Sequence, residues 1–308
     1  MRDNLPIFSV IVPTYRRPNA LCGCVQALSG LDYPRDGFEI IIVDDGGSIP
    51  LQSLLEPITR DISLKVVWQP NAGPAAARNF GASHAKGDML AFTDDDCAPA
   101  SNWLQAFASK SAVTESGLLG GRTINALENN PYAGASQLII DVVYAHYNRD
   151  PSAAHFFASN NMAVPANLFH DLKGFDPGFR TSEDRDLCDR WRSKGYPLQY
   201  AADAVIFHAH PLTLGSFWGQ HAGYGRGAWL YHTARANRGT GGFRVDWKFY
   251  EALLRSPLSK GLNRHVFRDF SLLMTAQIAN ATGCLEQALK ERWKRRRSSM
   301  AAHRPERR

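Results

Sequence analysis

The alternation of short apolar runs with helix-like segments over the first hundred residues constrains the fold more than any other feature of the sequence. Each run carries Val, Ile or Phe at consecutive positions, which is typical of strands buried on both faces. The segments between the runs have helical spacing and Gly or Pro at their ends. Strands of this kind joined by helices form an α/β fold, a doubly wound, mostly parallel sheet flanked by helices. The runs are FSVIVP at residues 8–13, FEIIIVDD at 38–45, LKVVWQ at 64–69 and DMLAFTDDD at 88–96.

The alternation becomes looser after residue 100, and the end of the chain is helical in pattern. With 308 residues, 44% of them hydrophobic, the chain can bury the core of one large α/β domain and carry an extension. We expect the α/β domain over residues 1–236 and a C-terminal helical extension with a basic tail over residues 237–308. Ser101 is predicted to cap a helix. Residues 214–236 also look helical, although their glycines argue against a regular helix.

Positive charge is concentrated at the C-terminal end. Residues 290–308 hold nine Lys or Arg and two Glu, a local charge of +7, whereas the whole chain carries +6. The remainder therefore sums to −1, and a basic surface for nucleic acid is not indicated. The tail is either a solvated end or a patch that contacts anionic lipid, and its composition alone favours neither.

The sequence indicates a cytoplasmic protein. Its first apolar run is broken by Pro13 and is too short for the apolar core of a secretory signal. The five cysteines have no zinc-type spacing, so we expect reduced thiols and no structural zinc. The uncharged stretch over residues 270–285 is shorter than the ~20 residues that a membrane span needs, and it contains Gln277 and Asn280.

Polar side chains follow the ends of three predicted strands. In a doubly wound sheet, ligands bind outside the carboxyl ends of the strands, so these side chains are expected to line one crevice. Asp94 and Asp96, with one residue between them, can lean toward one divalent ion, and Mg²⁺ and Mn²⁺ prefer such oxygen ligands. A solvated turn that begins a helix is the alternative.

Two further features also have both a functional and a purely structural interpretation. Asp44 and Asp45 in VDDGGS suit contact with a nucleobase or ribose, but they also suit an ordinary turn rich in Asp and Gly. Arg78 lies in a helix of small residues from which it can reach a phosphate, although a surface position is the commoner case for an arginine.

Four blocks of the sequence, in this order, resemble the family 2 glycosyltransferases, which have the GT-A fold. The blocks are SVIVPTYRRP, IIVDDGGS, NAGPAAARNFGASHAKGDMLAFTDDDC and GFDPGFRTSEDRDLCDRW, and the resemblance covers roughly residues 7–210. It implies that residues 1–236 form a GT-A glycosyltransferase domain. It also implies a nucleotide-diphosphate sugar as donor, a divalent metal such as Mn²⁺ or Mg²⁺ as cofactor, and inversion at the anomeric carbon.

The resemblance further implies roles for individual residues. The metal ligands would be Asp96, Asp94 and His208, with His210 as a weaker candidate behind His208. The family usually has VDDGS where this chain has VDDGGS, so the contacts after Asp45 depart from the family's pattern. The residues implied to bind the nucleotide sugar are Pro13, Thr14, Tyr15, Asp44, Asp45, Asn71, Arg78, Asp94, Asp95 and Arg226.

Inversion by direct displacement requires a base that accepts the proton of the acceptor hydroxyl. The block TSEDRDLCDRW supplies Glu183 and Asp184 after a glycine-rich loop. The alternative for these acids is a helix start, capped by Thr181 or Ser182, at which the helix dipole favours negative charge. Because the block matches the family's E-D pattern, we predict Asp184 as the base and assign Glu183 to acceptor contact or loop positioning.

A later stretch, FWGQHAGYGRG, is similar to a segment of family members and suggests a lid over the donor. Its aromatic and Arg side chains can stack on sugars or pair with a diphosphate, although aromatic residues at helical spacing are more often core. The residues concerned are Trp218, Gln220, His221, Tyr224, Gly225 and Arg226.

We therefore predict a metal-dependent inverting glycosyltransferase for polysaccharide, glycolipid or cell-envelope glycan synthesis, with a saccharide or lipid-linked acceptor. The stretch SLLMTAQIANATGCLEQALKERWKRRR would form an interfacial helix whose basic end contacts the cytoplasmic face of an anionic membrane, each Lys or Arg contributing about 1 kcal/mol. One alternative is a sugar-phosphate nucleotidyltransferase, but VPTYRRPNALCG lacks the Gly-rich phosphate loop that such an enzyme needs. The other alternative is a catalytically inactive, nucleotide-sugar-binding scaffold.

Overall fold

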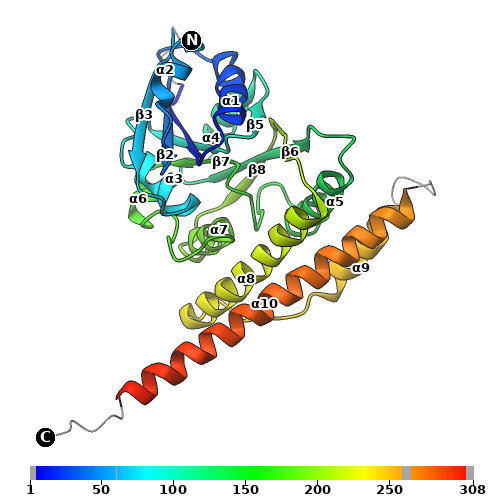
Figure 1. Ribbon diagram of the computed structural model, residues 1–308. Helices are drawn as coiled ribbons and strands as arrows, with labels where there is room; N and C mark the ends of the chain where they lie inside the picture. Colours follow the sequence, from blue (N-terminus) through cyan, green and yellow to red (C-terminus); the bar gives the residue numbers. More distant parts are fainter. Residues whose placement is uncertain (1–4, 60, 259–264, 303–308) are drawn as a thin grey trace, which may run out of the picture.

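An α/β part and a layer of long helices packed beneath it make up the protein (Figure 1). The computed structural model describes residues 5–59, 61–258 and 265–302. Up to the acidic triplet, helices alternate with strands as predicted. These elements are β1 (Phe8–Thr14), α1 (Pro18–Ser29), β2 (Phe38–Asp45), α2 (Leu51–Leu55), β3 (Ser63–Gln69), α3 (Pro74–Ala82) and β4 (Met89–Thr93).

The rest of the α/β part extends the same sheet, and the helical layer follows it in the chain. The remaining elements of the α/β part are β5 (Cys97–Pro99), α4 (Trp103–Ser111), β6 (Leu118–Asn125), α5 (Pro131–Tyr147), β7 (Asn161–Pro165), α6 (Ala166–Asp171), α7 (Glu183–Ser193) and β8 (Leu198–His208). The helical layer contains α8 (Leu214–Arg238), α9 (Trp247–Arg255), the short 3₁₀ helix η1 (Ser256–Leu258) and α10 (Val266–Ala302).

The sheet is mixed, and its parallel half is the half that the apolar runs predicted. Its eight strands lie in the order β3-β2-β1-β4-β7-β6-β8-β5. β1 is parallel to both β2 and β4, and β2 is parallel to β3. β7 is antiparallel to both of its neighbours, β4 and β6, and β6 and β8 are again parallel. The predicted α/β fold with a helical C-terminal extension is confirmed.

Each face of the sheet has its own apolar core. Because successive side chains of a strand point to opposite faces, Val10 and Val12 of β1 pack in the core formed with α1 and α4. Ile11, between them, packs in the other core, which includes residues of α3 and α7. Burial on both faces explains why these strands are continuous apolar runs in the sequence.

The carboxyl ends of β1, β2 and β4 lie at one edge of the sheet, as predicted. The register places Thr14 beside Asp44, and the acidic triplet follows β4 directly. The end of β8 returns to this triplet, because Cys97 of β5 pairs with His208. Polar side chains from four strands are thus brought to one edge.

The prediction that Ser101 caps a helix was wrong. α4 begins at Trp103, its N-cap position is occupied by Asn102, and no side-chain capping hydrogen bond is made. The preceding residues are held against β8, where the backbone N–H of Ala100 donates to the carbonyl of Val205 over 2.9 Å. The chain therefore turns into the helix after Ser101.

α8 is helical, as its sequence suggested, but it is one continuous helix, so the irregularity expected from its glycines was wrong. Two glycines allow close helix packing. A Cβ on Gly225 would lie 1.9 Å from the backbone oxygen of Asn280, and a Cβ on Gly283 would lie 1.9 Å from that of Ala222. The backbones of α8 and α10 are therefore in contact, and the two helices run side by side in the same direction (Figure 1).

α8 also connects the helical layer to α7. Gly227 faces the loop before α7, where Thr181 donates a 2.8 Å hydrogen bond to the carbonyl of Gly223. The boundary that we predicted at residue 236 falls within the last turn of α8. Among the described residues, no helix combines the length and apolar character that crossing a membrane would require.

Candidate active site

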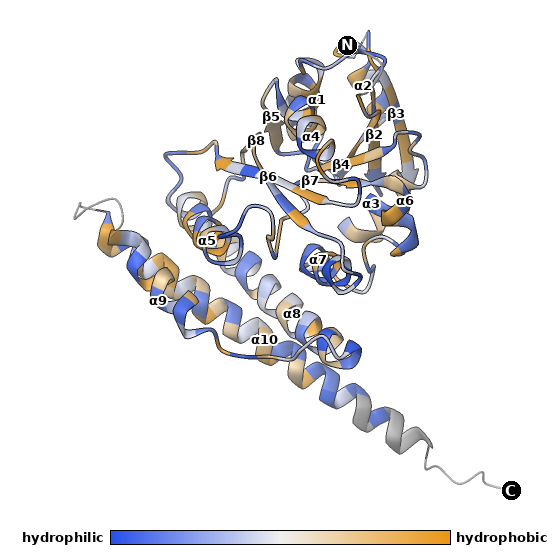
Figure 2. Cartoon of the chain, turned by 180° about the vertical axis from the view of Figure 1, so that it is seen from behind, coloured by the Kyte–Doolittle hydropathy of each residue, from blue (hydrophilic) through white to orange (hydrophobic). Residues whose placement is uncertain are grey.

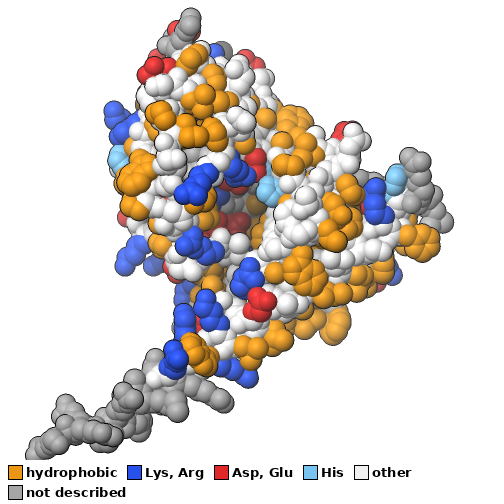
Figure 3. All heavy atoms as spheres, in the orientation of Figure 1, with side chains coloured by type: hydrophobic (Ala, Val, Ile, Leu, Met, Phe, Trp, Pro, Cys, Tyr) orange, Lys and Arg blue, Asp and Glu red, His pale blue; other side chains and the backbone are white. Residues whose placement is uncertain are grey.

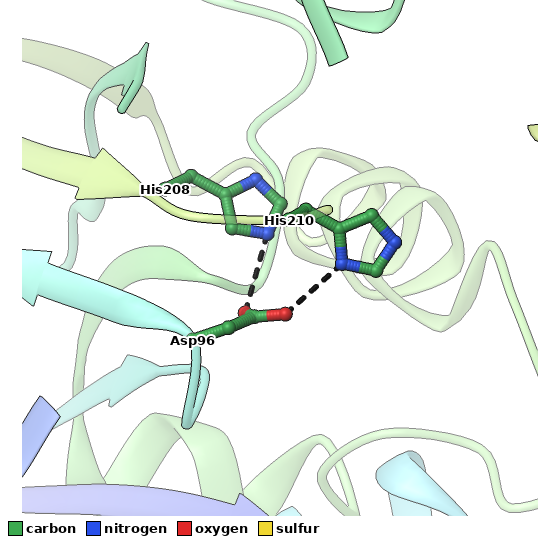
Figure 4. A group of neighbouring side chains, drawn as sticks. All are labelled: Asp96, His208 and His210. Atoms are coloured by element: carbon green, nitrogen blue, oxygen red, sulfur yellow. Dashed lines mark hydrogen bonds and ion pairs between the residues drawn. The ribbon is translucent and has the colours of Figure 1, made fainter. Parts of the chain in front are cut away.

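Asp96 is the centre of a group of three side chains from two separate segments. One carboxylate oxygen lies 3.2 Å from Nε2 of His208, and the other lies 3.0 Å from Nδ1 of His210. Figure 4 shows both imidazole rings near the carboxylate at the end of β8. Donor atoms from the three residues all lie within 4.8 Å of one another. This set of two nitrogens and one oxygen is a candidate site for a divalent cation.

The pairing of β5 with β8 positions this group. Asp96 directly precedes β5, and its backbone oxygen accepts a 2.8 Å hydrogen bond from the N–H of Ala209, between the two histidines. His208 and His210 are two residues apart in extended chain, so their rings lie on the same side and stack at 5.3 Å between centroids. The family resemblance ranked His210 behind His208, whereas both contact Asp96.

Local charge keeps Asp96 ionised. Burial on its own would raise the pKa of Asp96, but hydrogen bonds from His208 and His210 and the charge of Arg17 hold that pKa well below its usual range. An ionised carboxylate is the form that binds a metal. The carboxylate is therefore in the form that could bind a cation, whereas the histidines would have to be neutral to do so.

Arg17 reaches the same acidic segment from the loop after β1. It forms ion pairs with Asp95 and with Asp96, the second at 2.8 Å. Asp95 is fully buried and accepts a 2.6 Å hydrogen bond from Thr14. Burial raises the pKa of Asp95 to about 6, although Arg17 and Thr14 act in the opposite direction. The structure thus connects the end of β1 to the acidic triplet.

Sequence reasoning missed Arg17. The stretch PTYRRP places two arginines at the end of the first strand, opposite the acids that end the fourth strand. The ends of two neighbouring parallel strands lie at the same edge of the sheet. Charge pairing across that edge was therefore a signal that could have identified Arg17.

Arg78 joins the acidic triplet to α7. Its guanidinium is almost completely buried, and it forms ion pairs of 2.6 Å with Asp94 and 2.8 Å with Glu183. The guanidinium also lies 5.7 Å from the ring centroid of Phe175. The surface position weighed from the sequence is therefore excluded for Arg78. Asp94 lies with Arg78 rather than in the group formed by Asp96 and the histidines.

Asp184 follows Glu183 but has a different environment. Its carboxylate accepts a 2.7 Å hydrogen bond from the backbone N–H of Arg185. Burial, and then the negative charge of Glu183, raise the pKa of Asp184 from 3.8 to about 7. A carboxylate of this pKa is suited to accepting a proton near neutral pH. Ser182 occupies the N-cap position of α7 but makes no capping hydrogen bond with its side chain.

Asp45 uses both carboxylate oxygens to organise the loop between β3 and α3. One oxygen accepts hydrogen bonds from Gln69 at 2.7 Å and from the N–H of Ala72 at 2.8 Å. The other accepts from Asn71 at 3.1 Å and from the N–H of Gly73 at 2.9 Å. Asp45 and Asn71 are therefore brought together as predicted neighbours, and their contact with a nucleoside stays a prediction.

The other residues predicted near the nucleoside lie at the ends of β1 and β2. Asp44 is buried and accepts a 2.6 Å hydrogen bond from the N–H of Gly47. Pro13 pairs in register with Val43, and Tyr15 is exposed. Their contact with a nucleoside stays a prediction.

The stretch predicted as a lid lies on α8, and its side chains contact different parts of the protein. Tyr224 accepts a 2.9 Å hydrogen bond from Gln220. Burial, and then the charge of Asp184, raise the pKa of Tyr224 to about 12, which places this side chain near the candidate base. Arg226 instead forms a 3.0 Å ion pair with Glu286 of α10. Its predicted contact with the donor stays a prediction.

The face shown in Figure 3 has a hollow that contains acidic side chains. Lys and Arg side chains lie around its edge. A separate cavity of about 450 Å³ lies between the loop before α7, α8 and α10, and none of the predicted site residues lines it. Its lining includes Asp176, Phe179, Trp229, Asn237 and Arg292.

Comparison with known sequences gives a family match over more than half of the chain. The family described as Glycosyl transferase family 2 matches residues 9–173. A pre-mycofactocin glycosyltransferase of Mycobacterium tuberculosis (strain ATCC 25618 / H37Rv) is 27% identical over 283 residues. That match covers 90% of this chain and 58% of the relative.

Comparison with solved structures supports the same fold. Mannosyltransferase PcManGT from Pyrobaculum calidifontis, in complex with GDP-Man and Mn²⁺, has a TM-score of 0.62 at 20% identity, over 98% of this chain and 82% of that chain. S. aureus TarS 1–349, in complex with UDP-GlcNAc, has a TM-score of 0.57 at 15% identity, over 94% and 92%. At sequence identities of 20% and 15%, these similarities show a shared fold and nothing more specific.

Proposed function

The chain belongs to glycosyl transferase family 2, and we propose that it transfers a sugar from a nucleotide-diphosphate donor to an acceptor hydroxyl with inversion at the anomeric carbon. The position of Arg78 is the observation that carries this proposal. Its ion pairs join Asp94 of the acidic triplet to Glu183, the neighbour of the candidate base. Arg78 thus contacts one acid two residues before Asp96 and another directly before Asp184, so both candidate groups lie beside the same guanidinium.

Asp96, His208 and His210 would hold the cation. Mg²⁺ is usually bound by oxygen ligands alone, whereas imidazole nitrogens suit transition metals, so this mixed set favours Mn²⁺ over Mg²⁺. PcManGT, which shares the fold, is described in complex with Mn²⁺. When bound, the cation supplies positive charge that stabilises the leaving nucleoside diphosphate. In this proposal Asp94 keeps Arg78 in place and remains a candidate for contact with the donor.

The donor would lie along the ends of β1, β2 and β4. Thr14, Tyr15, Asp44 and the loop organised by Asp45 would contact the nucleoside. Arg78 and Arg17 would supply positive charge near the diphosphate, since guanidinium groups pair well with phosphate oxygens. The neighbours bind GDP-Man and UDP-GlcNAc, which supports a nucleotide-sugar donor and leaves the nucleoside to be identified by experiment.

Asp184 would accept the proton of the acceptor hydroxyl as that hydroxyl attacks the anomeric carbon. Its pKa of about 7 makes it a stronger base than an ordinary carboxylate while it is still largely ionised at slightly alkaline pH. Glu183 is held by Arg78 and would position the loop before α7 or contact the acceptor.

Residues 1–236 would perform the chemistry, and residues 237–308 would bring the protein to a membrane. The basic tail, including Lys290, Arg292 and Lys294, would contact the anionic cytoplasmic face of a membrane. This location would suit a lipid-linked saccharide acceptor in polysaccharide, glycolipid or cell-envelope glycan synthesis. The tail after residue 302 lies outside the described residues.

A screen of nucleotide sugars tests the proposal. Thermal unfolding of the full chain is measured with each nucleotide sugar, with and without Mn²⁺, and one donor is expected to raise the melting temperature only when Mn²⁺ is present. NMR of the transfer product should then show an anomeric configuration opposite to that of the donor. Retention would contradict the inverting mechanism. Donor binding without transfer to any acceptor would favour the scaffold, and release of pyrophosphate from a nucleoside triphosphate would favour the nucleotidyltransferase.

A further inference from the structure

The proposed chemistry does not use the outer face of α10, which is apolar and exposed. The inner face of this 37-residue helix packs on α8 through Ala276 and Gly283. The outer residues recur at helical spacing and form one stripe, which we call the α10 stripe. They are Phe267, Phe270, Met274, Ile278, Leu285, Leu289 and Trp293, with exposed fractions between 39% and 87%.

The α10 stripe is too long to be a chance cluster of surface residues. From Phe267 to Trp293 it extends for about 40 Å at the rise of an α-helix. Figure 3 shows hydrophobic side chains along the outer edge of the helical layer, away from the α/β part. A contiguous apolar surface of this size on a described face marks an interaction site or a membrane contact.

A second exposed segment, around α9, combines apolar and basic side chains. Its basic members are Arg244, Lys248 and Arg255, and it also holds Asp246 and Glu251, of which Glu251 forms an ion pair with Arg255. Aromatic rings beside Lys and Arg are typical of the boundary between lipid headgroups and acyl chains. Figure 2 shows the same mixture of hydropathy on α9. The apolar members are Phe243, Val245, Trp247, Tyr250, Leu254 and Leu258.

The α10 stripe could be covered by a membrane or by a second copy of the chain, and the charge of the extension favours a membrane. Residues 237–308 contain sixteen Lys or Arg and six Asp or Glu, a net charge of +10, whereas residues 1–236 carry −4. Two such extensions brought face to face would repel one another. An anionic surface, in contrast, would attract them, and Arg297 lies 3.8 Å from the ring centroid of Trp293 at the basic end of the stripe.

We propose that the α10 stripe, together with the exposed segment around α9, is a docking surface for an anionic lipid bilayer, with α10 lying in the plane of the interface. This inference gives the interfacial helix suggested by the sequence a defined apolar face, and it adds the segment around α9 to that face. It concerns a surface separate from the donor site. The close packing of α8 on α10 would then hold the acidic crevice at a fixed distance from the lipid headgroups.

Vesicle flotation of the full chain tests the docking surface. Vesicles of phosphatidylcholine with phosphatidylglycerol are compared with vesicles of phosphatidylcholine alone. The double variant Ile278→Glu with Leu285→Glu places two charges in the middle of the α10 stripe. The control, Leu54→Glu with Val113→Glu, places two charges at exposed apolar positions of the α/β part. Circular dichroism checks that both variants are folded.

The proposal predicts that the unmodified chain and the control bind the anionic vesicles, whereas the stripe variant loses binding by about tenfold or more. Equal binding by the stripe variant and the control would overturn it. A change from dimer to monomer in the stripe variant by sedimentation velocity, with unchanged vesicle binding, would assign the face to a second copy instead.

Donor binding is measured on the same samples. Mn²⁺-dependent stabilisation by a nucleoside diphosphate should be the same in the stripe variant as in the unmodified chain. Its loss in every sample would count against the proposed function and leave the docking result standing. Loss of vesicle binding with intact nucleotide binding therefore concerns the docking surface alone.

Discussion

The acids of α7 differ in how completely the structure pairs them with basic side chains. Asp186 and Asp189 are buried, and both are ion-paired with Arg238, at 2.7 and 2.8 Å. Arg190 and Arg235 add one further ion pair each. These acids fasten the C-terminal end of α8 to α7.

Asp184, two residues before Asp186, is less fully compensated. Among the described residues, no Lys or Arg forms an ion pair with it. Arg185 and Arg78 act to lower its pKa, but burial and the charge of Glu183 outweigh them and raise it to about 7. Ion-paired acids hold helices together, whereas an acid with such a raised pKa is suited to accepting a proton. The difference indicates that position within the charge network, more than residue type, separates the proposed base from the structural acids.

Removing the proposed base should have the largest effect. We expect Asp184→Asn to lower the rate of sugar transfer about a thousandfold, because the amide cannot accept the hydroxyl proton. Donor binding, measured by calorimetry with Mn²⁺, should be retained. Transfer within tenfold of the unmodified enzyme would move the base elsewhere and remove the contrast with the structural acids.

Removing a structural acid should affect stability instead. Asp189→Asn leaves Arg235 and Arg238 without their shared carboxylate, and breaking a buried pair costs about 3 kcal/mol. Urea unfolding should show this loss in the free energy of unfolding, while transfer measured well below the melting temperature stays within a few-fold. An unchanged unfolding midpoint would contradict the proposed fastening of α8.

The raised pKa of Asp184 should produce a smaller, pH-dependent effect on stability. Its folded pKa of about 7 exceeds its ordinary value of 3.8, so the stability that it contributes is present below that ordinary value and lost as pH rises through 7. Asp184→Asn should therefore raise the free energy of unfolding by about 1 kcal/mol near pH 8 and hardly at all near pH 4. Urea unfolding of both proteins at the two pH values checks the sign. A loss of stability at the higher pH would contradict it.

The strands and the edge that carries the site could be predicted from the sequence, because both-face burial leaves continuous apolar runs and strand ends collect polar residues. The antiparallel placement of β7 could not, since HFFASNNMAVP has no pattern that gives direction. The continuity of α8 was also missed. Gly225 and Gly283 are poor helix residues taken alone, and only their packing partners show why they are there.

The pairing within the site was likewise beyond sequence reasoning. Arg78 was predicted to lie near the nucleotide, but its simultaneous contact with Asp94 and Glu183 depends on the position of α7 in space. The contact of His210 with Asp96 depends on the pairing of β5 with β8. Long-range placement of this kind leaves no local pattern in the chain.

Mn²⁺ binding in the presence of a nucleoside diphosphate, followed by electron paramagnetic resonance, tests the central claim most directly. The unmodified chain should bind Mn²⁺, and Asp96→Asn should weaken binding at least about tenfold, because it removes the carboxylate between His208 and His210. The control variant Glu39→Gln removes a carboxylate of β2 that lies outside the cation site, and it should bind Mn²⁺ as the unmodified chain does. Equal Mn²⁺ affinity in Asp96→Asn and the unmodified chain would contradict a cation site at this edge of the sheet.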